Sequence, residues 1–154
     1  EQLAVRRVDA VISAGLPPAA TGFHTIELAH CPVALFGAPA FVKTYRNRFA
    51  KALREAPLLL PTTESSARRV LDTWFGMQGI TPRVVGEFDD ATLRESMAGA
   101  GAGMCFSPLV LQKELARTFG LRPIGTVRGP EARFFAVARS AAAMPFGPEH
   151  VRAA

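Results

Sequence analysis

Four hydroxyl side chains follow a short apolar segment near the middle of the chain. The segment Leu58–Leu60 stops at Pro61, and the hydroxyl residues come directly afterwards: Thr62, Thr63, Ser65 and Ser66. Hydroxyl groups at the start of a helix can cap its exposed N–H groups, with Thr62 and Thr63 as the caps and Glu64 in the first turn. The same groups can form a cradle for an anion or another polar ligand. The sequence leaves these two interpretations equally open.

A cluster of carboxylates follows the next extended segment, Arg83–Gly86. It comprises Glu87, Asp89 and Asp90, with Phe88 between them. Such a set could act as an acid–base group or hold a cation through its oxygens. A single aspartate that caps the following helix explains much of the same pattern, and we favour this interpretation.

The remaining motifs do not form a catalytic set. Gly99–Gly103 reads GAGAG, but these glycines follow a helix and precede a strand, which is the reverse of a phosphate-binding loop. We interpret them as a helix stop that permits close packing. The histidines, His24, His30 and His150, are interpreted as structural residues because no nucleophile or zinc motif accompanies them. Binding is therefore favoured over catalysis, and we expect no enzyme activity, cofactor or metal-ligand set.

The polar clusters require a strand–helix–strand unit to bring them together. Leu58–Leu60 reads as a buried strand and Arg83–Gly86 as a second strand. The helix between them has one apolar face, formed by Ala67, Val70, Leu71, Trp74 and Phe75. Its opposite side is expected to carry Arg68, Arg69 and Asp72. A helical crossover makes the two strands parallel, so a ligand site is expected outside their carboxyl ends.

Strands and helices alternate along the rest of the chain, which indicates an α/β fold. The further predicted strands are Val8–Ser13, Phe23–Leu28, Val33–Phe36, Met104–Phe106, Leu121–Val127 and Arg133–Ala138. Breaks are expected at Pro32 and at a Gly129–Pro130 turn. The further predicted helices are Pro39–Tyr45, Phe49–Glu55, Ala91–Gly99 and Leu109–Phe119. Glu1–Arg7 is expected to be the end of a helix, and a weak helix is expected from Pro148. Gly15–Gly22 is expected to be a loop.

Composition fits a globular chain of 154 residues, with 49% hydrophobic residues and a formal charge of +5. No apolar run approaches the roughly 18 residues of a membrane span. The densest basic stretch is Tyr45–Arg54, for which a solvated helix face is favoured over nucleic-acid contact. Cys31 and Cys105 are expected to be reduced, with a disulfide as the alternative. Because Glu1 is not a natural start, the chain is expected to be a piece of a longer protein.

Several segments, in their order and spacing, resemble the effector-binding domain of LysR-type transcriptional regulators. They are VDAVISAGLPP, HCPVALFGAP, LLLPTTESSARRVLDTWFGMQGI, VVGEFDDATL and GAGAGMCFSP. PTTESSARRVLDTWFGMQGI with GEFDD is similar, more narrowly, to the branch of the family that activates sodium/proton antiporter genes. The resemblance implies a type 2 periplasmic-binding-protein-like fold, with two Rossmann-like lobes joined by two crossing strands. Residues 1–31 and 121–154 would form lobe one, with its N-terminal part missing, and residues 32–120 would form lobe two.

The resemblance also implies which residues touch an effector in the cleft. They are Thr62, Thr63, Ser65, Phe88, Asp89, Asp90, Ser107 and Pro108. The implied partners are a small-molecule or cation effector and further copies of the chain in a homodimer or tetramer. DNA would be bound only through a winged helix-turn-helix that this chain lacks. The implied location is cytoplasmic, with no membrane partner. A solute-binding protein or small-molecule enzyme on the same fold, and a dimerisation module without a ligand, remain alternatives.

Overall fold

The computed structural model describes residues 8–14, 22–140 and 144. The chain divides into two compact units: Glu1–Cys31 with Ala132–Ala154, and Pro32–Glu131. We call them unit 1 and unit 2 and describe each by itself. The helices expected over Glu1–Arg7 and from Pro148, and nearly all of the Gly15–Gly22 loop, lie outside the described residues. Unit 2 ends at Glu131 rather than at residue 120, and its assignment as one lobe of a larger domain stays a prediction.

Unit 1 is built on antiparallel pairing between strands that are far apart in sequence. Strand β1 (Ala10–Ala14) pairs with the end of β6 (Arg122–Ala138), from Ala10 opposite Ala138 to Ala14 opposite Phe134. Strand β2 (His24–Gly37) begins in unit 1 and continues into unit 2, and β6 runs through both units as well. The predicted strand over Val8–Ser13 is thus confirmed with its start moved to Ala10.

Two predicted strand breaks are wrong. Strand β2 is continuous across Pro32. Its pairing with β5 begins only at Val33, so the N–H that Pro32 lacks is not needed on that side of the strand. Strand β6 is continuous across Gly129 and Pro130. Gly129 takes a φ of 111°, which a glycine adopts at little cost, so the chain direction is kept where a turn was expected.

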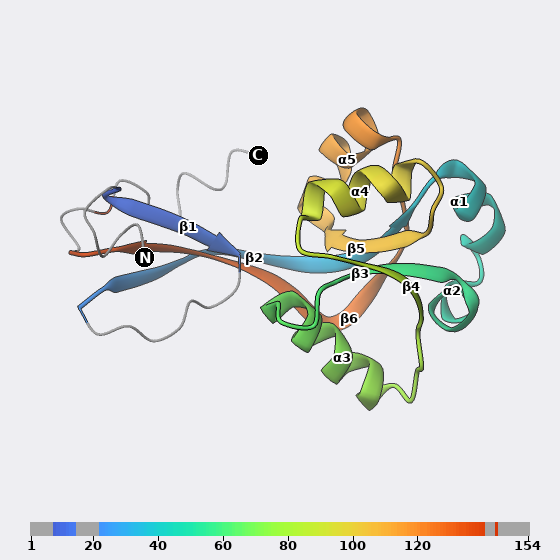
Figure 1. The fold of residues 1–154 in the computed structure, drawn as a ribbon, viewed down its shortest axis with the longest axis horizontal. Helices are drawn as coiled ribbons and strands as arrows, with labels where there is room; N and C mark the ends of the chain where they lie inside the picture. The colour runs from blue at the N-terminus through green and yellow to red at the C-terminus, as the bar shows by residue number, and fades with distance from the viewer. Residues whose placement is uncertain (1–7, 15–21, 141–143, 145–154) are drawn as a thin grey trace. The chain divides into compact units, whose positions relative to one another are not determined.

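Unit 2 contains a mixed sheet in the order β6-β2-β5-β3-β4 (Figure 1). Strands β3 (Pro57–Pro61), β4 (Arg83–Phe88) and β5 (Met104–Pro108) are parallel, whereas β2 pairs antiparallel with β5. The strand–helix–strand unit β3-α3-β4 is therefore confirmed. The helices are α1 (Pro39–Tyr45), α2 (Phe49–Glu55), α3 (Ser66–Met77), α4 (Ala91–Gly99) and α5 (Gln112–Phe119), the last preceded by a 3-10 turn over Leu109–Leu111.

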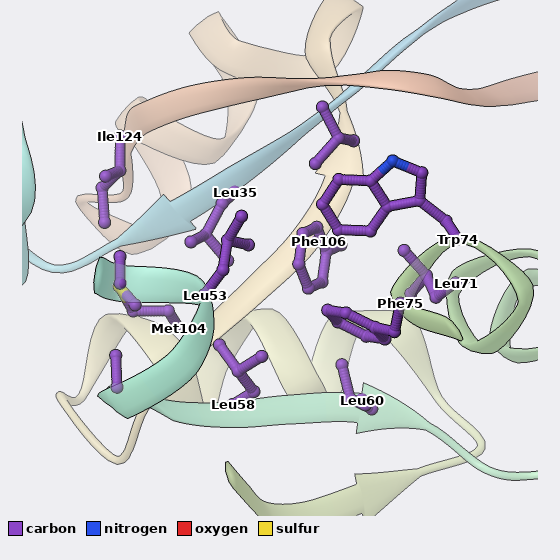
Figure 2. Packing of buried hydrophobic residues seen from close by; sticks show 13 residues of the cluster. Leu35, Leu53, Leu58, Leu60, Leu71, Trp74, Phe75, Met104, Phe106 and Ile124 are labelled. Carbon is purple, nitrogen blue, oxygen red and sulfur yellow. The ribbon is translucent and has the colours of Figure 1, made fainter. Parts of the chain in front are cut away.

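Alternate residues of β3 face two different cores. Leu58 and Leu60 are fully buried in a cluster that α2 and α3 cover, which Figure 2 shows around Trp74, Phe75 and Phe106. Leu59 faces the other cluster, which α4 and α5 cover. Both faces of the strand are thus buried, as expected for a parallel sheet with helices on each side. This burial fixes β3 in place, and the loop that follows β3 starts from a rigid position.

Two glycines at the end of α4 and before β5 allow close packing, as predicted. A Cβ atom at Gly99 would lie 2.4 Å from the backbone oxygen of Phe119, at the end of α5. A Cβ atom at Gly103 would lie 2.9 Å from the oxygen of Pro57. No helix in the part of the chain that the structure describes is long and apolar enough to cross a membrane.

Candidate functional site

The parallel strands of unit 2 end together at one edge of the sheet. Pro61 at the end of β3 lies opposite Phe88 at the end of β4, and β5 runs parallel on the other side of β3. The pairing extends one residue past β3, because the Thr62 amide donates to the Phe88 oxygen at 3.0 Å. We call this region the strand-end edge and define it as residues 62–66, 88–90 and 107–108. It brings Thr62 into contact with Phe88, and its role as a ligand site stays a prediction.

Helix α3 begins later than the sequence suggested. Its N-cap is Ser65, whose hydroxyl oxygen accepts a hydrogen bond from the Arg68 amide at 3.1 Å. The Ser65 amide donates to the Thr62 oxygen at 3.0 Å, which closes the turn before the helix. The prediction that Thr62 and Thr63 cap the helix is therefore wrong, and Glu64 precedes the first turn. Because neither threonine caps the helix, their hydroxyls serve no structural role at its N-terminus.

Arg68 connects the ends of strands β3 and β4 to helix α3. Its Nη1 atom donates to the Pro61 oxygen at 2.9 Å and to Glu87 Oε1 at 2.7 Å, so it ties the ends of β3 and β4 to α3. Its Nε atom donates to both carboxylate oxygens of Asp72, at 2.9 and 3.1 Å. The residue is only 9% exposed. The prediction that Arg68 lies on the solvent side of α3 is wrong, and Val70, predicted to be on the apolar face, is 46% exposed.

The charge of Arg68 is stabilised by its partners. Burial disfavours the charged guanidinium, but the hydrogen bonds to Glu87 and Asp72 outweigh that cost, so the pKa of Arg68 lies above its usual value. Glu87 and Asp72 themselves are 42% and 50% exposed at the side chain. Water therefore screens these pairs in part, and the bond to the buried Pro61 oxygen carries more of the structural role than the ion pairs.

The carboxylates after β4 have separate roles. Asp90 caps α4 by accepting a hydrogen bond from the Leu93 amide at 2.6 Å, which confirms the favoured interpretation. Glu87 is paired with Arg68, and Asp89 is exposed. In the described residues, no group of three or more histidine, cysteine, aspartate or glutamate side chains is arranged to hold a metal ion. The alternative of Glu87, Asp89 and Asp90 as one cation-binding set thus receives no support.

At the end of β5, Ser107 is buried and its hydroxyl donates to Glu95 Oε1 at 2.7 Å. Nearby, Arg94 Nη2 donates to the Phe106 oxygen at 3.3 Å. Pro108 is half-buried. The sequence analysis did not identify Arg94 and Glu95, which are both buried on α4. Their spacing could have indicated their burial. Ala98, which is buried, lies four residues after Arg94 and three residues after Glu95, so all three share one face of the helix.

Neither cysteine forms a disulfide: Cys31 is half-buried and Cys105 is buried. This confirms the favoured expectation. Burial raises the pKa of the Cys105 thiol from 9.0 to about 12, with the nearby Arg94 opposing that shift. The thiol therefore stays protonated at neutral pH and is a poor nucleophile. His24 and His30 lie in β2 within unit 1, and His150 lies outside the described residues.

A family model described as "LysR substrate binding domain" matches residues 1–153. The chain therefore belongs to the LysR substrate-binding-domain family, and the mixed α/β fold is that of LysR effector-binding domains, which are type 2 periplasmic-binding-protein-like. The family and fold implied by the sequence resemblance are confirmed.

Among curated proteins, the chain is similar to the transcriptional activator protein NhaR of Escherichia coli strain K12. The two are 27% identical over 140 residues, which cover 89% of this chain and 45% of NhaR. NhaR of Shigella flexneri matches to the same extent. The chain thus spans about half the length of the curated relatives it matches.

Solved structures show the same fold. The effector-binding domain of QuiR in complex with shikimate has a TM-score of 0.72 and 14% identity, covering 97% of this chain and 76% of that domain. CbnR, a LysR family transcriptional regulator, has a TM-score of 0.74 and 20% identity, covering 94% of this chain and 50% of CbnR. At these identities the likeness establishes the fold.

Replacing Arg68 with methionine is expected to lower the free energy of unfolding by about 1–3 kcal/mol, because the Pro61 oxygen loses its donor while the exposed partners regain water. Urea unfolding measures the effect. Arg69→Met is the matched control: Arg69 is exposed and donates only to the Glu64 oxygen, so its loss is expected to change stability by less than about 0.5 kcal/mol. Equal losses in the two variants would contradict the role given to Arg68.

Thiol labelling near pH 8 is expected to modify Cys31 in the folded chain and Cys105 only after unfolding, because the pKa of Cys105 is raised to about 12. Above pH 9 the unfolded thiol ionises while the folded thiol stays protonated, so Cys105 makes stability fall as pH rises. Thiol labelling of the folded Cys31→Ser variant near pH 8 should show no rapid reaction. Rapid labelling of Cys105 in the native chain would contradict its burial.

Proposed function

We propose that this chain is the ligand-sensing and dimerising regulatory domain of a bacterial LysR-type transcriptional regulator. The match of the LysR substrate-binding family over residues 1–153 is the observation that carries the proposal. The structure of a relative, QuiR, contains shikimate, and that of another, BenM, contains its effector benzoate. By analogy, the ligand of this chain would be a small molecule; a cation is the alternative that the similarity to NhaR suggests. The two units would then correspond to the two lobes of such a domain.

The proposed effector site is the strand-end edge of unit 2. The residues concerned are Thr62, Thr63, Ser65, Phe88, Asp89, Asp90, Ser107 and Pro108. They do not contribute equally, since Ser65, Asp90 and Ser107 already serve as caps or internal hydrogen-bond partners. Phe88 packs against the core cluster beneath α4. Thr62, Thr63 and Asp89 therefore supply the polar groups that are best placed to meet a ligand.

Regulation of a sodium/proton antiporter gene is the specific form of the proposal. It is supported by the similarity to NhaR, which is named a transcriptional activator, and by the PTTESSARRVLDTWFGMQGI and GEFDD segments. The complete regulator would act in the cytoplasm as a homodimer or tetramer and would bind DNA through a winged helix-turn-helix in a longer chain. A domain of this kind has no catalytic role. The free energy available for regulation would be limited by the difference in effector affinity between the two conformations of the domain, typically ~1–3 kcal/mol.

A thermal-shift titration of the full-length regulator tests this proposal. Lithium, sodium and potassium are compared at matched ionic strength, beside a panel of small organic acids that includes shikimate and benzoate. A specific ligand should raise the melting temperature as its concentration exceeds its dissociation constant. A response to lithium and sodium but not potassium would support cation sensing, and a response to one organic acid would support a small-molecule effector.

Variants at the strand-end edge make the test specific. Thr62→Val with Thr63→Val should abolish the ligand-induced shift while leaving the ligand-free melting temperature nearly unchanged, because neither hydroxyl caps α3. Thr73→Val is the control: its hydroxyl donates within α3 to the Arg69 oxygen, so the shift should persist. A shift that survives in the double variant would place the site elsewhere, and a regulator that responds to no compound would contradict ligand sensing.

A further inference from the structure

Six basic side chains gather around two neighbouring hollows on unit 2. The first hollow, of about 800 Å³, is lined by α1, the turn after it and the start of β6. The second, of about 470 Å³, is lined by α5 and the start of β6. Arg122 lines both hollows. We call this surface the basic patch and define it by its cations: Lys43, Arg46, Arg48, Lys113, Arg117 and Arg122.

The positive charge of the basic patch is largely uncompensated. No aspartate or glutamate lines either hollow. Among the ion pairs of the described residues, the one that involves a patch cation joins Arg117 to Glu114 at 2.9 Å. All six side chains are exposed, so their charges are available to a partner from solution.

The shape and chemistry of the patch favour an extended polyanion over a small organic ligand. Small-molecule pockets are mostly apolar and bury most of the ligand. Among the described residues, the lining of both hollows adds to the six cations only short apolar side chains and a few polar ones, with no aromatic ring to enclose a ligand. Duplex DNA presents a charge about every 1.7 Å along its axis, so it can meet exposed cations around both hollows, which share Arg122.

We propose that the basic patch binds the phosphate backbone of duplex DNA without sequence specificity. This departs from the sequence-based expectations that Tyr45–Arg54 is only a solvated face and that DNA is bound only through a winged helix-turn-helix. The chain brings Lys43–Arg48 together with Arg122, which lies more than seventy positions later, and so extends the basic stretch that the sequence showed only over Tyr45–Arg54. In a DNA-bound regulator, as proposed above, the patch would add contacts to DNA beside the operator. The contact itself does not depend on an effector.

Fluorescence anisotropy of a labelled duplex of arbitrary sequence, titrated with the 154-residue chain, tests the proposal. The triple variant Arg46→Gln, Arg48→Gln, Arg122→Gln removes three patch charges. If each contacts a phosphate, log K against log salt should become shallower by about 2.7 between about 50 and 200 mM salt. Affinity at the lowest salt should fall by at least about tenfold.

The control variant is Arg69→Gln, Arg83→Gln, Arg128→Gln, which removes the same charge from exposed positions that line neither hollow. Its affinity should fall much less, and thermal melts should show that both variants are folded. Equal losses would mean that general charge alone attracts the DNA and would overturn the proposal. So would the absence of binding by the unmodified chain, or saturable binding of inorganic phosphate or citrate without binding of DNA. An effector response that persists without DNA binding would leave the proposed function intact.

Discussion

The bond network of Arg68 is the constraint on which the strand-end edge depends. One guanidinium reaches the Pro61 oxygen at the end of β3, the Glu87 carboxylate near the end of β4 and Asp72 one turn along α3. A buried guanidinium without such partners would be costly, so the three elements are held in one arrangement or the site does not form. The arrangement leaves Thr62 and Thr63 outside the network. The arginine thus stabilises the fold without engaging the neighbouring hydroxyls.

The rigidity of this edge comes from the sheet beneath it. Leu58, Leu59 and Leu60 are buried on alternating faces, under α2 and α3 on one side and α4 and α5 on the other. Trp74 adds a further tie, since its indole N–H donates to the Arg128 oxygen in β6 at 2.9 Å while its ring contacts Phe75 (Figure 2). Binding groups placed on a packed scaffold of this kind lose little conformational freedom when a ligand arrives.

Much of the fold could be predicted from the sequence because local signals agree with the packing. The apolar run of β3, the stop at Pro61, the Asp90 cap and the glycine at the end of α5 each specify an element boundary on their own. The errors arose where tertiary context overrides a local signal. Pro32 and Gly129 look like breaks, yet the sheet accommodates both. Arg68, Arg94 and Glu95 look solvent-exposed by residue type, yet partners from distant segments bury them. Ser107 looked available, but Glu95 occupies its hydroxyl, and no local pattern reports such a partner.

A ligand is proposed to bind at the strand-end edge, beside the Arg68 network. Amide chemical-shift mapping of the ¹⁵N-labelled chain tests it most directly, with the effector panel titrated one compound at a time. The account predicts that one ligand shifts the amides of Thr62, Thr63 and Asp89 together, in a saturable manner, and leaves the helix α2 amides unchanged. Shifts confined to other parts of unit 2, with the amides of residues 62–66 and 88–90 unmoved, would contradict it.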